Sequence, residues 1–151
     1  MESTVIGNFI KLTIDFIGKC LYFNVVLRLQ AAEPLKTLQA RNEFRELVNS
    51  LPTLLAQQLK CGLRKSEGFQ RFLVVGEKGE ITNNKADVSK PHLVTVEGCA
   101  LPRGQTASQL ASVVELKQVI GAALLPIIDE LEYQGVKWLP PRGIKSKQVP
   151  S

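Results

Sequence analysis

The sequence predicts an α+β domain in which an antiparallel sheet carries two main helices on one face. The first thirty residues alternate between apolar and polar side chains, which is the period of a β-strand. Residues 34–62 and 106–134 instead repeat apolar side chains every three or four positions, as an α-helix does. Short apolar runs between and after these regions complete an expected order of ββα(α)ββα(β).

Two arrangements fit this order. A ferredoxin-like split βαβ core with an extra N-terminal strand is the more economical, and a longin-like sheet with two helices is the alternative. The chain has 151 residues, the size of one domain with an ordinary core. We expect a single domain over residues 1–139 and a polar C-terminal tail over residues 140–151.

The N-terminal strands form a predicted β-hairpin. Residues Met1–Asn8 are expected to be a short lead, and Gly18-Lys19 is expected to be the turn between the two strands. One face of this hairpin is apolar and needs a cover. Its apolar positions are Ile10, Leu12, Ile14, Phe16, Leu21, Phe23, Val25, Leu27 and Leu29.

An amphipathic helical region follows and supplies the predicted cover. Pro34 suits the first turn of a helix. Pro52 is expected to interrupt the helix, with Ser50 capping a second, short helix that ends at Gly62. The inward positions are Leu38, Phe44, Leu47, Val48, Leu51, Leu54, Leu55 and Leu59.

Two more strands are predicted in the second half of the chain. Phe69–Val75 is the first, and Gly76–Glu80 is expected to be the turn that follows it. Thr82–Lys90 is polar and typical of an exposed loop. His92–Val96 is the next strand, followed by a loop over Glu97–Gln105. Val136–Leu139 is a further short strand.

The longest apolar-periodic run, Thr106–Gln134, predicts the second main helix. Thr106 and Gln109 fit a capping box, and Gly135 can end the helix in a left-handed conformation. The central run VIGAALLPII is apolar on every side and is expected to be buried all round. A straight helix of this length would span about 43 Å. We therefore expect it to break at Pro126, or one end to leave the globule and dock on a partner.

Composition restricts the class of protein. The net charge is +5, which suits solubility and permits contact with nucleic acid or an acidic partner. The three cysteines, Cys20, Cys61 and Cys99, favour a reducing compartment over a disulfide framework or a zinc site. Neither a transmembrane span nor a signal peptide is predicted, so the expected location is cytoplasmic or within a cytoplasmically assembled particle.

The loop GCALPRGQT is the sharpest candidate for chemistry, because it precedes a helix and Arg103 adds a positive charge. It departs from a phosphate-binding loop: the Gly98–Gly104 spacing is one residue too long, and Gln105 stands in place of lysine. His92 is the only histidine and is more typical of an ordinary strand residue. We expect no catalytic residue, metal or cofactor.

Basic residues form the second group of candidates. They could contact an anion or a nucleic-acid backbone, with Trp138 as a nearby aromatic. An acidic patch near the end of the second helix comprises Asp129, Glu130 and Glu132. The candidate contact residues are Lys60, Arg64, Lys65, Arg71, Arg103, Arg142, Lys145 and Lys147.

These observations lead to an expected function without catalysis. The leading hypothesis is a structural or assembly subunit of a larger complex, for example a virion neck or tail component or part of a bacterial multiprotein assembly. It would act through oligomerisation and tail docking, with itself or other protein subunits as partners. The alternative is an RNA- or DNA-binding subunit that uses the basic residues, and the third hypothesis is an enzyme acting through the Gly98–Thr106 loop.

Overall fold

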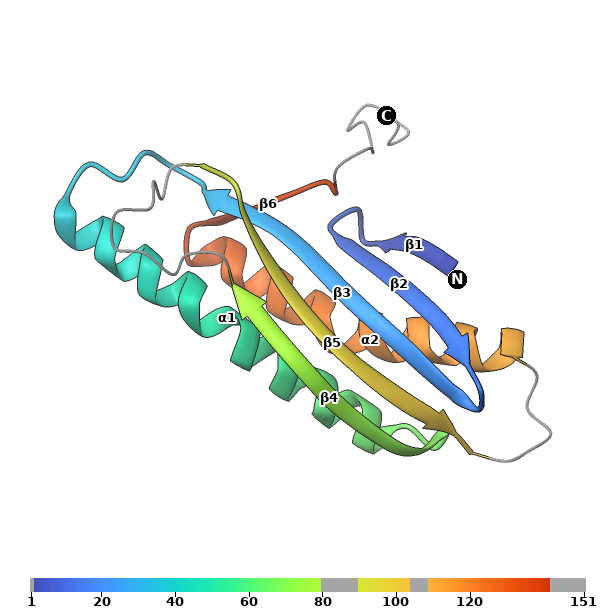
Figure 1. Cartoon of the computed structure of the whole chain (residues 1–151). Helices are drawn as coiled ribbons and strands as arrows, with labels where there is room; N and C mark the ends of the chain where they lie inside the picture. The colour runs from blue at the N-terminus through green and yellow to red at the C-terminus, as the bar shows by residue number, and fades with distance from the viewer. Residues whose placement is uncertain (1, 80–89, 104–108, 142–151) are drawn as a thin grey trace.

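The computed structural model describes residues 2–79, 90–103 and 109–141, and it confirms the α+β class (Figure 1). Both helices lie on one face of an antiparallel sheet, and none of the described residues forms an element that covers the other face (Figure 1). The elements are β1 (Glu2–Ile6), β2 (Ile10–Ile17), β3 (Cys20–Ala31), α1 (Leu38–Lys65), β4 (Phe69–Gly79), β5 (His92–Pro102), α2 (Gln109–Tyr133) and β6 (Val136–Leu139).

Within the described residues, the sheet has six strands: β1-β2-β3-β5-β4 lie in that order, and β6 also pairs with β3. One edge of the long strand β3 is shared: Cys20–Leu27 pairs with β2, and Arg28–Ala31 pairs with β6. Strands β3 and β4 are parallel, with β5 antiparallel between them. The order β6-β3-β5-β4 is that of a split βαβ core, to which the chain adds β1 and β2.

The N-terminal segment differs from the expected lead, because β1 is a strand that pairs with β2 from Glu2↔Ile14 to Ile6↔Ile10. Gly7 and Asn8 have φ values of 60° and 65° and make the turn between the two strands. Positive φ at both central residues is the geometry of a tight hairpin turn, for which asparagine and glycine are the favoured residues. Gly7-Asn8 is therefore a turn signal that the sequence carries, and the strand before it lies in the segment expected to be a lead.

Helix α1 corrects the expected pair of helices. The helix begins after Thr37, whose Oγ1 accepts a hydrogen bond from the Ala40 N–H at 3.0 Å, and not at Pro34. It continues through Pro52, which is buried, to Lys65. Ser50 does not cap a second helix, because its hydroxyl donates to the Leu47 carbonyl at 2.7 Å. Burial of the apolar side chains on both sides of the proline holds the helix together and outweighs its missing N–H.

Strands β4 and β5 both extend beyond their expected ends. The expected turn at Gly76–Glu80 is wrong up to Gly79, because Gly76 pairs with Glu97 at a register shift and Gly79 pairs with Val94. The expected loop at Glu97–Gln105 is wrong as far as Pro102, because this segment is the second half of β5. The polar stretch Thr82–Lys90 lies outside the described residues except for Lys90.

The core lies between the sheet and the two helices. The hairpin residues that alternate toward the helices are buried as expected, except that Phe16 is half-buried. Helix α2 does not break at Pro126, and it ends before Gly135, which has a φ of 96°. The expected capping box at Thr106 lies outside the described residues. Strand β6 is confirmed, and its Trp138 is buried, with Nε1 donating to the Ile128 carbonyl at 3.0 Å.

Candidate interaction surface

Helix α2 has an apolar side turned to solvent. The expectation that VIGAALLPII is buried all round is wrong, because Ala122 and Pro126 are exposed and only the sheet-facing side is buried. Leu110, Val114 and Tyr133 are 71%, 44% and 91% exposed. A surface helix normally turns polar and charged side chains to water. Helix α2 therefore has more apolar side chains than its packing on the sheet requires.

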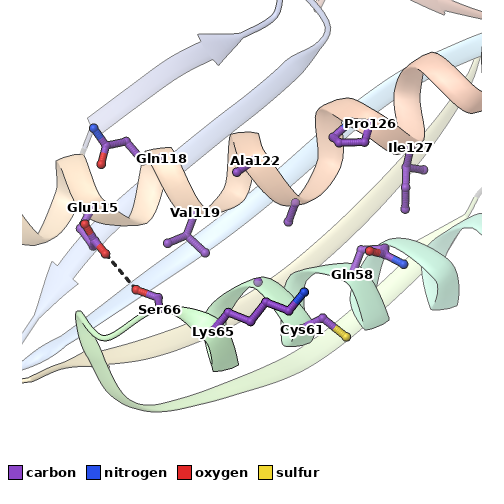
Figure 2. Close-up of a pocket in the computed structure, with 12 residues that line it drawn as sticks. Gln58, Cys61, Lys65, Ser66, Glu115, Gln118, Val119, Ala122, Pro126 and Ile127 are labelled. Carbon is purple, nitrogen blue, oxygen red and sulfur yellow. Dashed lines mark hydrogen bonds between the residues drawn. The ribbon is translucent and has the colours of Figure 1, made fainter.

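Between α1 and α2 the surface is hollowed into a groove with a volume of about 440 Å³ (Figure 2). Most of the α2 side of the groove is apolar, and the α1 side carries polar and small residues. The α2 residues are Glu115, Gln118, Val119, Ala122, Ala123, Pro126 and Ile127, and the residues on or just after α1 are Gln58, Cys61, Gly62, Lys65 and Ser66.

Small residues bring the two helices close at the middle of the groove. A Cβ added at Gly62 would lie 3.0 Å from the Ala123 Cβ and 3.5 Å from the Val119 Cγ1. Further along, the Ser66 hydroxyl donates to Glu115 Oε1 at 2.9 Å (Figure 2). These contacts show that the helices run antiparallel, with Gly62 level with the centre of α2.

Charge is distributed unevenly along this two-helix layer. Lys60, Arg64 and Lys65 are exposed on the last turns of α1, beside the N-terminal half of α2. At the opposite end is a hollow of about 980 Å³, and all of its charged lining residues are acidic: Glu33, Glu43, Glu46 and Glu132. Asp129 and Glu130 are exposed on the same end of α2. Arg41 and Arg45 also belong to this part of α1 but do not line the hollow.

The basic candidates are divided between two faces of the molecule. Lys60, Arg64 and Lys65 lie on the helical layer, whereas Arg71 pairs with Leu101 on the uncovered face of the sheet. Arg103 follows β5, and its backbone N–H donates to the Gly68 carbonyl at 2.8 Å. The structure brings only the first three together. Arg142, Lys145 and Lys147 lie outside the described residues.

The candidate segment Gly98–Thr106, expected to lie in a loop, belongs to strand β5 as far as Pro102. Gly98 is in β5, and a Cβ added there would lie 2.5 Å from Phe23 Cζ and 2.7 Å from the Leu73 carbonyl oxygen. The glycine is thus required by close packing inside the sheet. Residues 104–108 are outside the described residues. Trp138 is buried in the core, so its ring is not available to stack on a base.

His92 is buried in β5 opposite Leu29, as an ordinary strand residue would be. Across residues 2–79, 90–103 and 109–141, no group of three or more His, Cys, Asp and Glu side chains could hold a metal ion. The described cysteines Cys20, Cys61 and Cys99 are free thiols, and Cys61 is the exposed one.

A smaller hollow of about 290 Å³ lies on the sheet, lined by Thr13, Asp15, Tyr22, Phe23, Asn24, Glu97 and Gly98. Asn24 Oδ1 is buried there without a hydrogen-bond partner in the part of the chain that the structure describes. The lining combines two carboxylates with neutral polar groups, and it contains none of the predicted basic residues.

Helix α2 is also long and apolar enough to cross a membrane by length and composition alone. Core helices of soluble proteins meet the same criterion, and 39% of the apolar window of α2 is buried inside this fold. One such helix is weak evidence for a span.

Comparisons with known proteins supply no relative: no protein-family model, curated protein or solved structure matches the chain.

Proposed function

We propose that this protein is a non-enzymatic assembly subunit that binds other protein chains through the layer formed by α1 and α2. The favoured partner is another copy of the same chain. The observation that carries this proposal is the solvent-facing apolar side of α2. No charged residue occurs from Gln118 to Ile128, although Gln118, Ala122 and Pro126 are exposed. Contiguous apolar surface of this kind is typical of protein interfaces.

The groove beside α2 supports the same proposal. It is open, mostly apolar on one wall, and rimmed by Gln58, Lys65 and Glu115. An apolar centre with a polar rim is the usual composition of a protein–protein interface. A small-molecule site would instead enclose its ligand and present several convergent polar groups.

The mass in solution tests this proposal. We expect light scattering to give a discrete oligomer whose mass exceeds the 16.7 kDa of one chain and persists at high salt, because an apolar contact is not screened. A mass of one chain at every protein concentration would contradict it.

The same sample distinguishes the nucleic-acid alternative. A nucleic-acid-binding subunit would retain nucleic acid and release it steeply as salt rises, because each phosphate contact displaces a counterion. An oligomer free of nucleic acid at low salt supports the assembly role. Purification with tightly bound nucleic acid, lost together with the higher mass at high salt, would count against it.

A further inference from the structure

We infer that the partner on this surface is a second copy of the chain, packed face to face on the helical layer with the two α2 helices antiparallel. The two-fold axis would pass beside Ala122, perpendicular to α2 and in the plane of the interface. This inference rests on the proposed function and adds the identity of the partner and the geometry of the contact.

The outer side of α2 is self-complementary about Ala122. Ala111, Gln118, Pro126 and Tyr133 are all exposed, and each lies within about 40° of Ala122 around the helix. An isologous contact requires that if residue i meets residue j, then j meets i. An antiparallel copy centred on Ala122 meets this condition, because Gln118 faces Pro126 and Ala111 faces Tyr133.

The shape of the layer also suits a helix from a second copy. Gln118, Ala122 and Pro126 are four residues apart and form one ridge of α2. The groove between α1 and α2 lies directly beside that ridge. Because the axis is perpendicular to α2 and lies in the plane of the interface, this ridge would lie on the same ridge of the second copy, and the two grooves would face each other. Ala122 is small, which allows the two backbones to approach at the crossing.

Charge complementarity favours the antiparallel orientation. Because Gly62 is level with Ala123, the basic end of α1 at Arg64 and Lys65 lies toward the N-terminal side of the axis. The two-fold operation carries Asp129 and Glu130 of the second copy to that same side. A parallel pair would place like charges together. Opposite charges around an apolar centre set the orientation of a complex more than its affinity.

Two sets of like-charge contacts oppose this arrangement and limit the expected affinity. Because Gly62 lies level with the axis, Lys60 of each copy comes level with Arg64 of the other. Asp129 of each copy also approaches Glu115 of the other. The Ser66 hydroxyl already donates to Glu115 Oε1 at 2.9 Å, and the side chain of Lys65, which also lines the groove, extends toward Gln58 and away from this pair (Figure 2).

The available area predicts a weak dimer. With 25 residues, α2 is about 37 Å long, and a contact strip about 10 Å wide covers about 370 Å² on each copy. The short overlap of the α1 helices brings the total for both copies to about 1,000 Å², the lower limit for a specific interface. Interfaces of this size are typical of weak or transient contacts, so we expect a dimer whose population depends on protein concentration.

Native Cys61 provides the first test. It is exposed, lines the groove and neighbours Gly62, so the two copies of Cys61 would lie beside the axis. A short bifunctional maleimide is expected to join two wild-type chains, and Cys61→Ser is expected to abolish the product. As a matched control, Leu73→Cys in the Cys61→Ser background places an exposed thiol on the uncovered sheet face, where no cross-link is expected.

Ala122→Glu provides the second test, because it places two carboxylates at the axis. The mass is expected to fall to that of one chain, while Leu73→Glu on the sheet face leaves the mass unchanged. Far-ultraviolet circular dichroism checks that both variants remain folded.

The combined outcomes separate this inference from the proposed function. Cross-linking through Cys61 together with a monomeric Ala122→Glu supports the antiparallel dimer. This geometry is overturned, and the assembly role remains, if the wild-type chain is an oligomer and Ala122→Glu has the same mass. The same conclusion follows if Leu73→Cys cross-links and native Cys61 does not. A wild-type chain that is monomeric at every concentration overturns both.

Discussion

Helices α1 and α2 lie in the same layer and cover the same sheet, yet their outer sides differ. The exposed side of α1 is charged, with Arg41, Glu43, Lys60 and Arg64 in contact with water. The exposed side of α2 has no charged residue between Lys117 and Asp129. Packing on the sheet explains the apolar inner side of both helices, and contact with water explains the charged outer side of α1. Neither explains the uncharged outer side of α2. The outer side of α2 therefore requires a second explanation, and the proposed partner chain would supply it.

The largest expected effect is a loss of stability when a buried leucine is truncated on the inner side of either helix. The two helices should respond alike. Leu55 in α1 and Leu116 in α2 are both fully buried. Replacing either with alanine removes packing and leaves a cavity, so the free energy of unfolding is expected to fall by about 2–5 kcal/mol in both cases. Denaturant titration at low protein concentration measures this. A cost confined to Leu55→Ala would mean that α2 is not held by the core.

A smaller effect distinguishes the two helices through their prolines. Pro126 is exposed, whereas Pro52 is buried. Proline in a helix interior costs about 3 kcal/mol relative to alanine. Pro126→Ala is therefore expected to raise the free energy of unfolding by up to about 3 kcal/mol. Pro52→Ala also loses buried apolar contact, at about 0.8 kcal/mol per methylene, and should gain only about 1 kcal/mol. Thermal melts of the two variants at equal concentration compare them, and an equal gain would contradict the difference in burial.

The smallest effect concerns the start of α1. Thr37 Oγ1 accepts from the Ala40 N–H, so Thr37→Ala leaves that donor without its cap and is expected to lower the free energy of unfolding by about 1 kcal/mol. Thr37→Ser retains the acceptor and serves as the matched control. A loss of equal size in both variants would mean that the hydroxyl does not cap the helix.

The spacing of apolar residues predicted the type of element where one face is buried and the other is exposed to solvent. The alternation from Ile10 to Leu29 led to the hairpin and its covered face, and the helical repeat led to both helices. Helix boundaries were less predictable. Pro52 signals a break in isolation, but the burial of α1 on both sides of it keeps the helix continuous.

Glycines show why the second half of β5 was expected to be a loop. Gly98 and Gly76 both resemble loop residues in the sequence. The structure shows that Gly98 is held between Phe23 and Leu73, whereas a Cβ at Gly76 would meet only Glu97 Oε2 at 3.8 Å. The reason for Gly98 lies on strands far away in the sequence, so local patterns could not reveal it.

The candidate surface was hidden for a related reason. A helix that is apolar on every side can be buried all round in one chain, or buried on one side and covered by a second chain on the other. The run VIGAALLPII has the same letters in both cases. Only the positions of Ala122 and Pro126 relative to the sheet distinguish the two.

The central claim is that the outer side of α2 is a contact surface between chains. Sedimentation equilibrium of the wild-type chain beside Ala122→Glu, across one concentration series, tests it most directly. The account predicts that the wild-type mass rises from 16.7 kDa toward twice that value, while the variant remains at the mass of one chain. Identical masses for the two proteins at every concentration would contradict it.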